Sequence, residues 1–340
     1  MRTFQCGCGA DLFFHSAHCI SCGRMVSRCA SCQTVTSVDQ NTGTCDSCST
    51  KLEPCKNRVD HEVCNGTVLN ESNETHCRYC TLNRVIPDLS LEGNLEKWRL
   101  AERAKQRVLF DIDRIGLPID DDDTLPLVFE FKTAEKEPVS TGHADGVITL
   151  DLAEADSVHR ERTRVQFGEP HRTLVGHFRH ELGHYFWQKC VLPGRIELFR
   201  ELFGDERNPS YAEARDQYYN QRAPANWQQA YVSEYATMHP WEDFAETFNA
   251  YLDMIAIART FGHFQKGGYA INEENFDFLI TDYRNIGIMA NELNRDMGLL
   301  DLVPEVFTPP VIEKMRFIHE MARRQTEPSG SPAKKARVAV

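Results

Sequence analysis

The stretch His180-Glu181-Leu182-Gly183-His184 has the residue types and the spacing of a hydrolytic zinc site. Residues four apart lie on one face of an α-helix, so both histidines can place an imidazole nitrogen on the same zinc ion. Glu181 can accept a proton from a zinc-activated water and pass it to the leaving amine. The alternative interpretation is a polar cluster on the surface of a core helix, so an enzyme hypothesis needs further ligands.

A catalytic zinc ion needs a third protein ligand and an open fourth position. No His, Asp or Glu occurs between residues 185 and 196, which excludes a histidine or carboxylate ligand shortly after the motif. Further on, the stretch HPWEDFAETFNAY (239–251) places Glu242 and Glu246 one helical turn apart. Glu242 can bind zinc while Glu246 accepts a hydrogen bond from a ligand imidazole. Asp243 is the alternative residue for either role.

Twelve of the 13 cysteines lie between residues 6 and 80, and their spacing divides them into three quartets. Two short cysteine turns can surround one zinc ion tetrahedrally, and four thiolates leave no position open for catalysis. We therefore expect about three structural zinc ions beside one catalytic ion. The last quartet has the loosest spacing, so His61 or His76 could replace one cysteine, and pairing across quartets stays open. The predicted ligands are Cys6, Cys8, Cys19 and Cys22; Cys29, Cys32, Cys45 and Cys48; and Cys55, Cys64, Cys77 and Cys80.

The charge of the chain disfavours nucleic acid as a partner. The formal net charge is −12, and residues 1–84 balance eight Lys or Arg against eight Asp or Glu. Contacts of Lys and Arg with phosphate supply most of the affinity for nucleic acid, so we expect the cysteine-rich region to bind a protein. No stretch has the pattern of a signal peptide or of a membrane span. We expect a cytoplasmic protein, since reduced thiols there bind metal.

Three stretches resemble a bacterial family of putative zinc-binding metallopeptidases with an N-terminal zinc-ribbon region. They are TGHADGVITLDLAEAD (141–156), RTLVGHFRHELGHYFW (172–187) and SEYATMHPWEDFAETF (233–248). The catalytic part is more distantly similar to gluzincins such as anthrax lethal factor, in which the first Glu of an E-F-F-A-E helix binds zinc. Here Asp243 stands in place of the first Phe.

This resemblance implies roles for several residues. Glu242 would be the third zinc ligand, and Glu246 would support a ligand imidazole. Tyr235, seven residues before Glu242, would donate a hydrogen bond to the transition state. The strand GVITLDLA (146–153) would be the edge strand that pairs with the extended substrate, with an ordinary sheet strand as the alternative. We expect no ligand role for His143, and we expect His177 to contact a carboxylate.

These residues require an α+β fold in which a zincin-like metallopeptidase domain follows small zinc-ribbon modules. The expected domains are a ribbon region (1–84), a linker (85–95), the metallopeptidase domain (96–325) and a disordered basic tail (326–340). Apolar periodicity predicts helices at 96–116, 169–191, 211–223, 240–258, 273–297 and 309–324. Runs rich in β-branched and aromatic residues predict strands at 125–132 and 146–153.

The sequence thus predicts an intracellular zinc metalloendopeptidase that hydrolyses peptide bonds with Glu181 as general base. Its ribbons would dock a protein or peptide substrate or a partner protein. One alternative is a nucleic-acid-associated protease or adaptor, which the basic stretch AKKARV near the C-terminus favours. Another alternative is a non-catalytic zinc scaffold. A purely structural site would not need a base at the position of Glu181, so this residue disfavours the scaffold.

Overall fold

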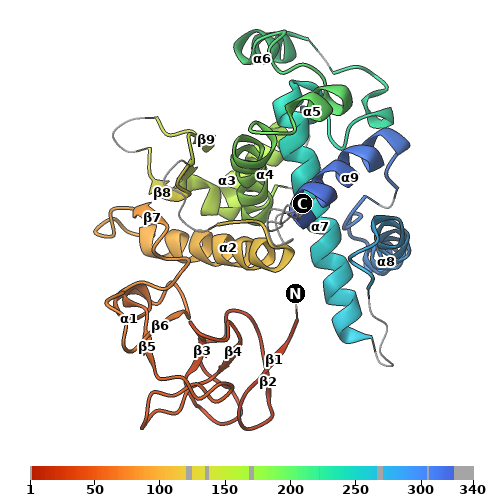
Figure 1. The fold of residues 1–340 in the computed structure, drawn as a ribbon. Helices are drawn as coiled ribbons and strands as arrows, with labels where there is room; N and C mark the ends of the chain where they lie inside the picture. The colour runs from red at the N-terminus through yellow and green to blue at the C-terminus, as the bar shows by residue number, and fades with distance from the viewer. Residues whose placement is uncertain are drawn as a thin grey trace, which may run out of the picture.

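A computed structural model describes residues 2–119, 125–134, 138–167, 172–221, 223–265, 271–304 and 306–324. Figure 1 shows the cysteine-rich residues on one side of the long helix α2 (Asn94–Ile115) and the remaining helices and main sheet on the other. The prediction of an α+β fold is confirmed by this arrangement. The predicted tail at 326–340 lies outside the described residues.

The cysteine-rich region folds as three small ribbons, each built on one two-stranded antiparallel sheet. Short strands joined by cysteine turns bury little apolar surface, so such modules depend on metal for their stability. The strand pairs are β1 (Phe4–Gln5) with β2 (Asp11–Leu12), β3 (Val26–Arg28) with β4 (Val35–Ser37), and β5 (Leu52–Pro54) with β6 (Thr67–Leu69). Helix α1 (Lys56–His61) belongs to the third ribbon.

Helix α2 is the shared core element of the two halves. It starts after Gly93 and ends at Gly116, whose φ of 80° is a left-handed C-cap. The ring of Phe110 lies 4.8 Å from the ring of Phe14 in the first ribbon, measured between centroids. Trp98, which is fully buried, packs against His61 of the third ribbon at 5.5 Å. The ribbons and the helical half therefore share one continuous hydrophobic core.

The main sheet has four strands in the order β7-β8-β10-β9. These are β7 (Asn83–Val85), β8 (Val128–Lys132), β10 (Val147–Asp151) and β9 (Gly142–Ala144). β7 and β8 are parallel, as are β8 and β10, whereas β9 runs antiparallel to β10. β7 follows Cys80 by only a few residues, so the chain enters the sheet at the end of the predicted ribbon region (1–84), and only Val85 belongs to the predicted linker (85–95).

The expectation that the strand at 146–153 is an edge strand is wrong. β10 pairs with β8 along its whole length and with β9 over Val147–Thr149, so both of its sides carry a strand. The edge strand next to it is β9, which the sequence pattern did not predict because Gly142, His143 and Ala144 lack the β-branched residues of a typical strand.

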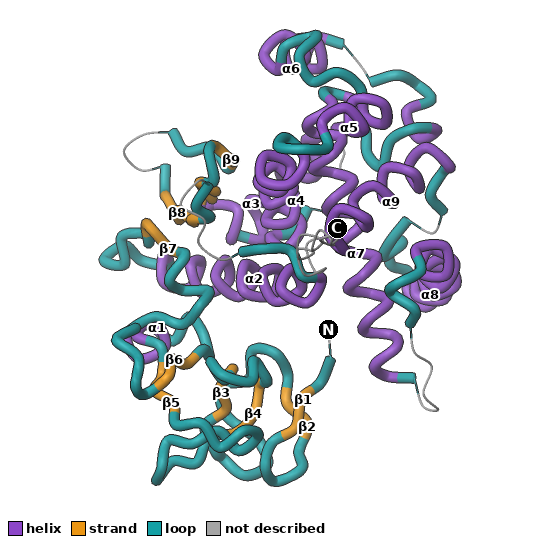
Figure 2. The backbone as a smooth tube through the Cα atoms, viewed as in Figure 1, coloured by secondary structure: helices purple, strands orange, loops and turns teal. Residues whose placement is uncertain are grey.

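The helices after the sheet include most of those predicted (Figure 2). The motif helix is α4 (Leu174–Phe186), continued by a π-turn at Trp187–Val191. The helices predicted to start at residues 211, 240, 273 and 309 correspond to α6 (Tyr211–Asn220), α7 (Pro240–Phe264), α8 (Phe276–Asp296) and α9 (Pro309–Arg324). The sequence pattern did not predict α3 (Ser157–Phe167) or α5 (Ile196–Phe203).

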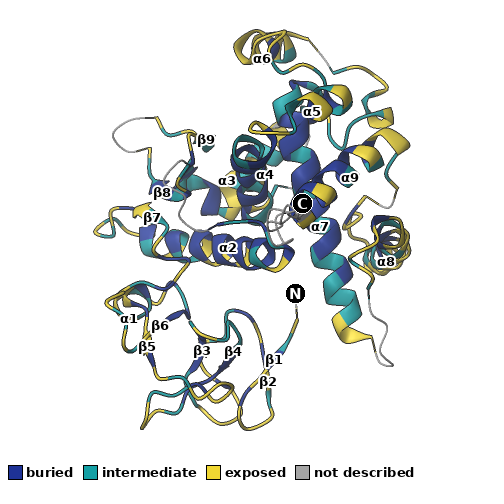
Figure 3. Ribbon diagram, viewed as in Figure 1, coloured by how far each residue is buried: buried dark blue, intermediate teal, exposed yellow. Residues whose placement is uncertain are grey.

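Helix α4 lies at the centre of the helical half. It packs against α2 and against α7, and α8 and α9 cover other parts of α7. Figure 3 shows that buried residues run along α2, α4 and much of α7, while α6 is largely exposed. Within the described residues, no helix is long and apolar enough to cross a membrane.

We predict that Phe110→Ala destabilises both halves of the protein, because its ring joins the first ribbon to α2. Truncation of a buried Phe costs about 3–5 kcal/mol of unfolding free energy. Hydrogen exchange should accelerate in residues 4–38 as well as in α2. Leu100→Ala, on the exposed side of the same helix, should change neither region. Unchanged exchange in the ribbon would contradict a shared core.

Candidate metal centre

Helix α4 places the two motif histidines on one face. Thr173 caps its N-terminus by accepting a hydrogen bond from the backbone NH of Gly176. Phe178 and Leu182 are buried on the core side of the helix. His180 and His184, one turn apart, present their Nε2 atoms to each other at 3.1 Å.

Helix α7 brings the downstream carboxylates to the same place. His239 caps this helix, since its side chain accepts a hydrogen bond from the backbone NH of Trp241, and Pro240 occupies the first turn. Glu242 and Glu246 follow one turn apart and both face α4.

Gly183 permits the close crossing of α4 and α7. A Cβ atom at this position would lie 2.8 Å from Cα and 3.2 Å from Cβ of Ala245. The glycine within the motif and the alanine between the two glutamates therefore form the contact point of the helices. Larger residues at either position would separate the histidines from the carboxylates.

Three donor atoms form a compact triangle at this crossing. Oε2 of Glu242 lies 3.0 Å from Nε2 of His180 and 3.4 Å from Nε2 of His184, and the two nitrogens are 3.1 Å apart. Ligand atoms bound tetrahedrally to zinc at about 2.0–2.1 Å lie about 3.3 Å from one another. The triangle has the dimensions of three zinc ligands with a fourth position available.

The polar surroundings of Glu242 also fit a metal ion. Its Oε2 atom is buried and accepts no hydrogen bond from the described residues. Its other oxygen, Oε1, accepts a hydrogen bond from the hydroxyl of Tyr211 at 2.9 Å. Burial alone would raise the pKa of Glu242, but the two histidines hold this pKa well below its usual range, so the carboxylate is ionised.

His180 is oriented by a hydrogen-bond chain from α7. Its Nδ1 donates to Oε1 of Glu246 at 2.7 Å, and the hydroxyl of Ser233 donates to Oε2 of the same carboxylate at 2.6 Å. With its proton on Nδ1, His180 presents the Nε2 lone pair to the triangle.

His184 is oriented by packing rather than by a hydrogen bond. Its ring lies 3.7 Å from the ring of Trp241, measured between centroids, and the two planes are inclined by 34°. Its Nδ1 is buried and has no hydrogen-bond partner in the described part of the chain. Trp241 therefore contacts the candidate ligand directly.

Glu181 is buried beside the triangle, with 8% of its surface exposed. Its carboxylate has no hydrogen-bond or ion-pair partner among the described residues, in contrast to Glu246. Burial is the main cause that raises its pKa; His180 and His184 act to lower this pKa, and the charges of Glu242 and Glu246 act to raise it.

The alternative ligand, Asp243, is engaged elsewhere. Its Oδ2 forms a buried ion pair with Nζ of Lys314 on α9 at 2.6 Å, and burial raises its pKa to about 7. This ion pair directs Asp243 away from the histidines.

The two other histidines near the site lie outside the triangle. The ring of His143, on β9, lies 6.4 Å from that of His184. Nδ1 of His177 lies 3.7 Å from Oε2 of Glu154, the carboxylate neighbour expected from the sequence, although this distance is too long for a hydrogen bond. Burial lowers the pKa of both His143 and His177 to about 4, so both are neutral at pH 7.

Tyr235 lies just before α7, with its ring 6.0 Å from that of His180. Burial is the main cause that raises its pKa, and the charge of Glu242 adds to it, so the phenol keeps its proton at neutral pH. Its role as a hydrogen-bond donor stays a prediction.

The three cysteine quartets assemble in sequence order. In the first, the Sγ atoms of Cys6 and Cys22 are 3.6 Å apart, and those of Cys8 and Cys19 are 3.7 Å apart. In the second, the corresponding pairs, Cys29 with Cys48 and Cys32 with Cys45, are separated by 3.7 and 3.9 Å. Sulfur atoms bound tetrahedrally to zinc at about 2.3 Å lie about 3.8 Å apart, so both quartets fit one ion each.

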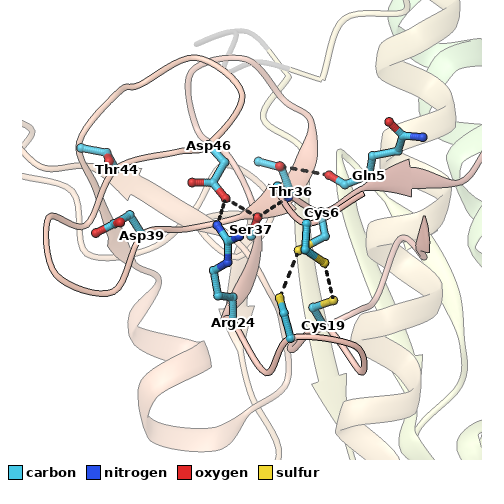
Figure 4. A network of polar contacts seen from close by, with 12 residues as sticks. Gln5, Cys6, Cys19, Arg24, Thr36, Ser37, Asp39, Thr44 and Asp46 are labelled. Atoms are coloured by element: carbon cyan, nitrogen blue, oxygen red, sulfur yellow. Dashed lines mark hydrogen bonds and ion pairs between the residues drawn. The ribbon is translucent and has the colours of Figure 1, made fainter. Parts of the chain in front are cut away.

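The first two ribbons are joined by a polar network (Figure 4). Asp46, in the last cysteine turn of the second ribbon, forms an ion pair with Arg24 of the first ribbon at 2.8 Å. Ser37 donates a hydrogen bond to the same carboxylate, and its hydroxyl accepts one from the backbone NH of Gly7 at 2.8 Å. The network fixes the two cysteine quartets relative to each other.

The third quartet is the most enclosed. Cys55, Cys77 and Cys80 are buried, and Gln106 of α2 donates a hydrogen bond to Sγ of Cys80 at 3.6 Å. The buried guanidinium of Arg28 lies 3.6 Å from Sγ of Cys77 and supplies a positive charge beside the thiolates. All four members are cysteines, since His61 packs against Trp98 and His76 contacts Thr75.

Sequence reasoning missed three residues of the site: Tyr211 and Trp241, which contact the candidate ligands, and Ser233, which contacts Glu246. Ser233 and Trp241 lie within the stretch that was singled out, and their contacts follow from the position of α7 against α4. Tyr211 lies 31 residues before Glu242 on a separate helix, and no spacing rule connects the two.

Comparisons with known proteins agree with this geometry. Residues 94–321 match a family described as "Putative zinc-binding metallo-peptidase", and residues 3–91 match a zinc-ribbon domain. Uncharacterized proteins of Mycobacterium bovis and Mycobacterium tuberculosis are 36% identical to the chain over 348 aligned residues, covering 98% of each sequence. No solved structure gives a significant match.

We predict that Gly183→Ala separates α4 from α7. The overpacked crossing should cost about 1–3 kcal/mol of unfolding free energy and weaken metal binding at the triangle while the cysteine quartets keep their zinc. Thermal unfolding and elemental analysis test this. Gly194→Ala is the control, because no atom lies within 4 Å of its added Cβ. Normal metal content and stability in Gly183→Ala would show that the crossing tolerates a methyl group.

We also predict that Gly66→Ala removes about one zinc ion per chain, since four thiolates hold one ion. The added Cβ would lie 2.5 Å from Sγ of Cys77, inside the third quartet. Elemental analysis against Gly194→Ala measures the loss, and an unchanged zinc content would contradict the assignment of this quartet.

Proposed function

Because the chain belongs to the putative zinc-binding metallo-peptidase family, we propose that it is a zinc metalloendopeptidase of the gluzincin type. His180, His184 and Glu242 hold the catalytic zinc ion. The observation that carries this proposal is the buried Oε2 atom of Glu242, which has no hydrogen-bond partner among the described residues and lies 3.0 and 3.4 Å from the two histidine nitrogens. The cysteine quartets would hold about three further ions, for a total of about four.

A zinc ion at this triangle would polarise the scissile carbonyl and lower the pKa of a water molecule. Glu181 accepts the proton of the attacking water and returns it to the leaving amine. Its freedom from other partners and its raised pKa suit both transfers. Glu246 and Ser233 hold the proton of His180 on Nδ1. Tyr235 donates a hydrogen bond to the negatively charged oxygen that develops on the carbonyl.

We propose that an extended peptide substrate pairs with β9. This strand has β10 on one side and no strand on the other among the described residues, and it contacts α4. His143 on β9 packs near His184, so a peptide along this edge would pass the metal site. Main-chain hydrogen bonds would bind such a peptide without requiring a particular side chain.

The first and third ribbons have different roles in this proposal. The third is a structural joint, because α2 and Arg28 enclose it. The first exposes Phe13 by 65% and Ile20 by 98%, so it offers apolar contacts for docking a substrate or partner protein. Twelve reduced thiols suit a reducing compartment, and we propose that the protein is cytoplasmic.

We predict that Glu181→Gln abolishes proteolysis and leaves metal binding intact. Loss of a general base should lower kcat by about 10²–10⁴-fold, measured as cleavage of a peptide library. Elemental analysis should find the parental zinc content. Glu201→Gln, on the surface of α5, is the matched control and should cleave normally.

Retained cleavage by Glu181→Gln would disprove the proposed mechanism. A parent protein with zinc at the triangle but without cleavage of the library would favour the scaffold hypothesis. The inactive variant can also be used in its source cell, because a trapped substrate should be retained by Glu181→Gln and released by the double variant Glu181→Gln, Glu242→Ala.

A further inference from the structure

Tyr211 contacts the candidate metal ligand although it belongs to neither of the ligand helices. Its hydroxyl donates to Oε1 of Glu242 at 2.9 Å. The other oxygen, Oε2, faces the histidine nitrogens at 3.0 and 3.4 Å. The two oxygens of the Glu242 carboxylate therefore have different neighbours. Oε1 accepts the hydrogen bond of the hydroxyl, and Oε2 faces the two histidine nitrogens.

We propose that Tyr211 is a positioning residue that makes Glu242 bind the metal through one oxygen only. The inference rests on the proposed function of this site. Two imidazoles and one carboxylate oxygen leave a fourth tetrahedral position for water. If both oxygens of Glu242 bound the ion, the second would compete with water for that position.

The physical basis is competition for Oε1. A carboxylate can bind a cation through one oxygen or through both. A hydrogen bond to an ionised carboxylate is stronger than one between neutral groups, and Oε1 would have to leave Tyr211 in order to turn toward the ion. Contacts of this kind, made to a ligand rather than to the metal, commonly fix the geometry of metal sites.

The position of Tyr211 is determined from two sides. It is the first residue of α6, and a capping box between Ser210 and Glu213 fixes the backbone there. Its ring packs edge-on against His239 at 5.4 Å and against Trp241 at 5.6 Å, measured between centroids. Both partners lie at the start of α7, directly beside Glu242. The same helix start therefore positions the hydroxyl of Tyr211 and the carboxylate of Glu242.

The inference separates the two tyrosines near the site. The hydroxyl of Tyr211 donates its hydrogen to Glu242, so it cannot donate that hydrogen to the substrate. The hydroxyl of Tyr235 forms a hydrogen bond with that of Tyr211 and none with a zinc ligand within the described residues. In its proposed role it would turn from Tyr211 to the reacting carbonyl. Removal of either hydroxyl should reduce turnover, but only removal of the Tyr211 hydroxyl should change how the metal ion is coordinated.

The test uses Co²⁺ as a spectroscopic probe in the full chain. The triangle is emptied with a chelator while the cysteine quartets keep zinc, and Co²⁺ is then added. The absence of sulfur-to-cobalt charge transfer verifies that the probe occupies the triangle. Four-coordinate Co²⁺ absorbs visible light more strongly than five-coordinate Co²⁺, so the spectrum reports whether Glu242 binds through one oxygen or two.

We predict that Tyr211→Phe weakens the visible absorption severalfold, toward that of a five-coordinate site. Tyr235→Phe should keep the parental spectrum. Tyr219→Phe, on the same helix and 62% exposed, is the matched control and should keep both spectrum and activity. Circular dichroism and thermal unfolding of Tyr211→Phe should match the parent, because the substitution removes one hydroxyl and keeps the ring.

A parental Co²⁺ spectrum in Tyr211→Phe would overturn the inference, whatever its activity. Failure of Tyr211→Phe to bind Co²⁺ would also overturn it, since Tyr211 would then be needed for ligand binding as such. These outcomes are distinct from failure of the proposed function, which is measured by cleavage in the parent and in Glu181→Gln.

Discussion

The crossing of α4 and α7 at Gly183 and Ala245 is the contact on which the metal centre depends. Helix α4 carries two of the three candidate ligands and α7 carries the third, so neither helix alone supplies the full set. The approach of the two backbones brings the carboxylates of α7 within reach of the imidazoles of α4. Their other contacts, Asp243 with Lys314 and α4 with α2, hold the two helices at this separation.

The ribbon region is part of this framework. Its third quartet is closed by α2, and the chain passes from Cys80 into β7 and thus into the main sheet. The cysteine-rich half and the peptidase half match separate families, yet they share a hydrophobic core. A boundary between sequence families here does not coincide with a boundary between folding units.

The sequence was informative where the chemistry is local. Residues four apart on one helix must share a face, so His180 and His184 could be paired without a structure, and cysteine spacing was enough to group the quartets. The helices with strong apolar periodicity, α2 and α7, were predicted at close to their observed starts. β9 was missed because strand formation there depends on β10, and β10 was assigned to the edge because strand order is a tertiary property. Tyr211 could not be found because only the packing of α6 against α7 brings it to Glu242.

The order of the candidate ligands along the sequence has a consequence for biosynthesis. Proteins fold from the N-terminus while the ribosome is still adding residues. The cysteine quartets, all complete by Cys80, can take up zinc long before α7 has been made. The histidine pair follows, but it lacks its carboxylate until α7 leaves the ribosome. Under the proposed function, the ribbons of the nascent protein could therefore hold metal before the protein could cut a neighbouring chain, because the catalytic ligand set is complete only after α7 has followed α4.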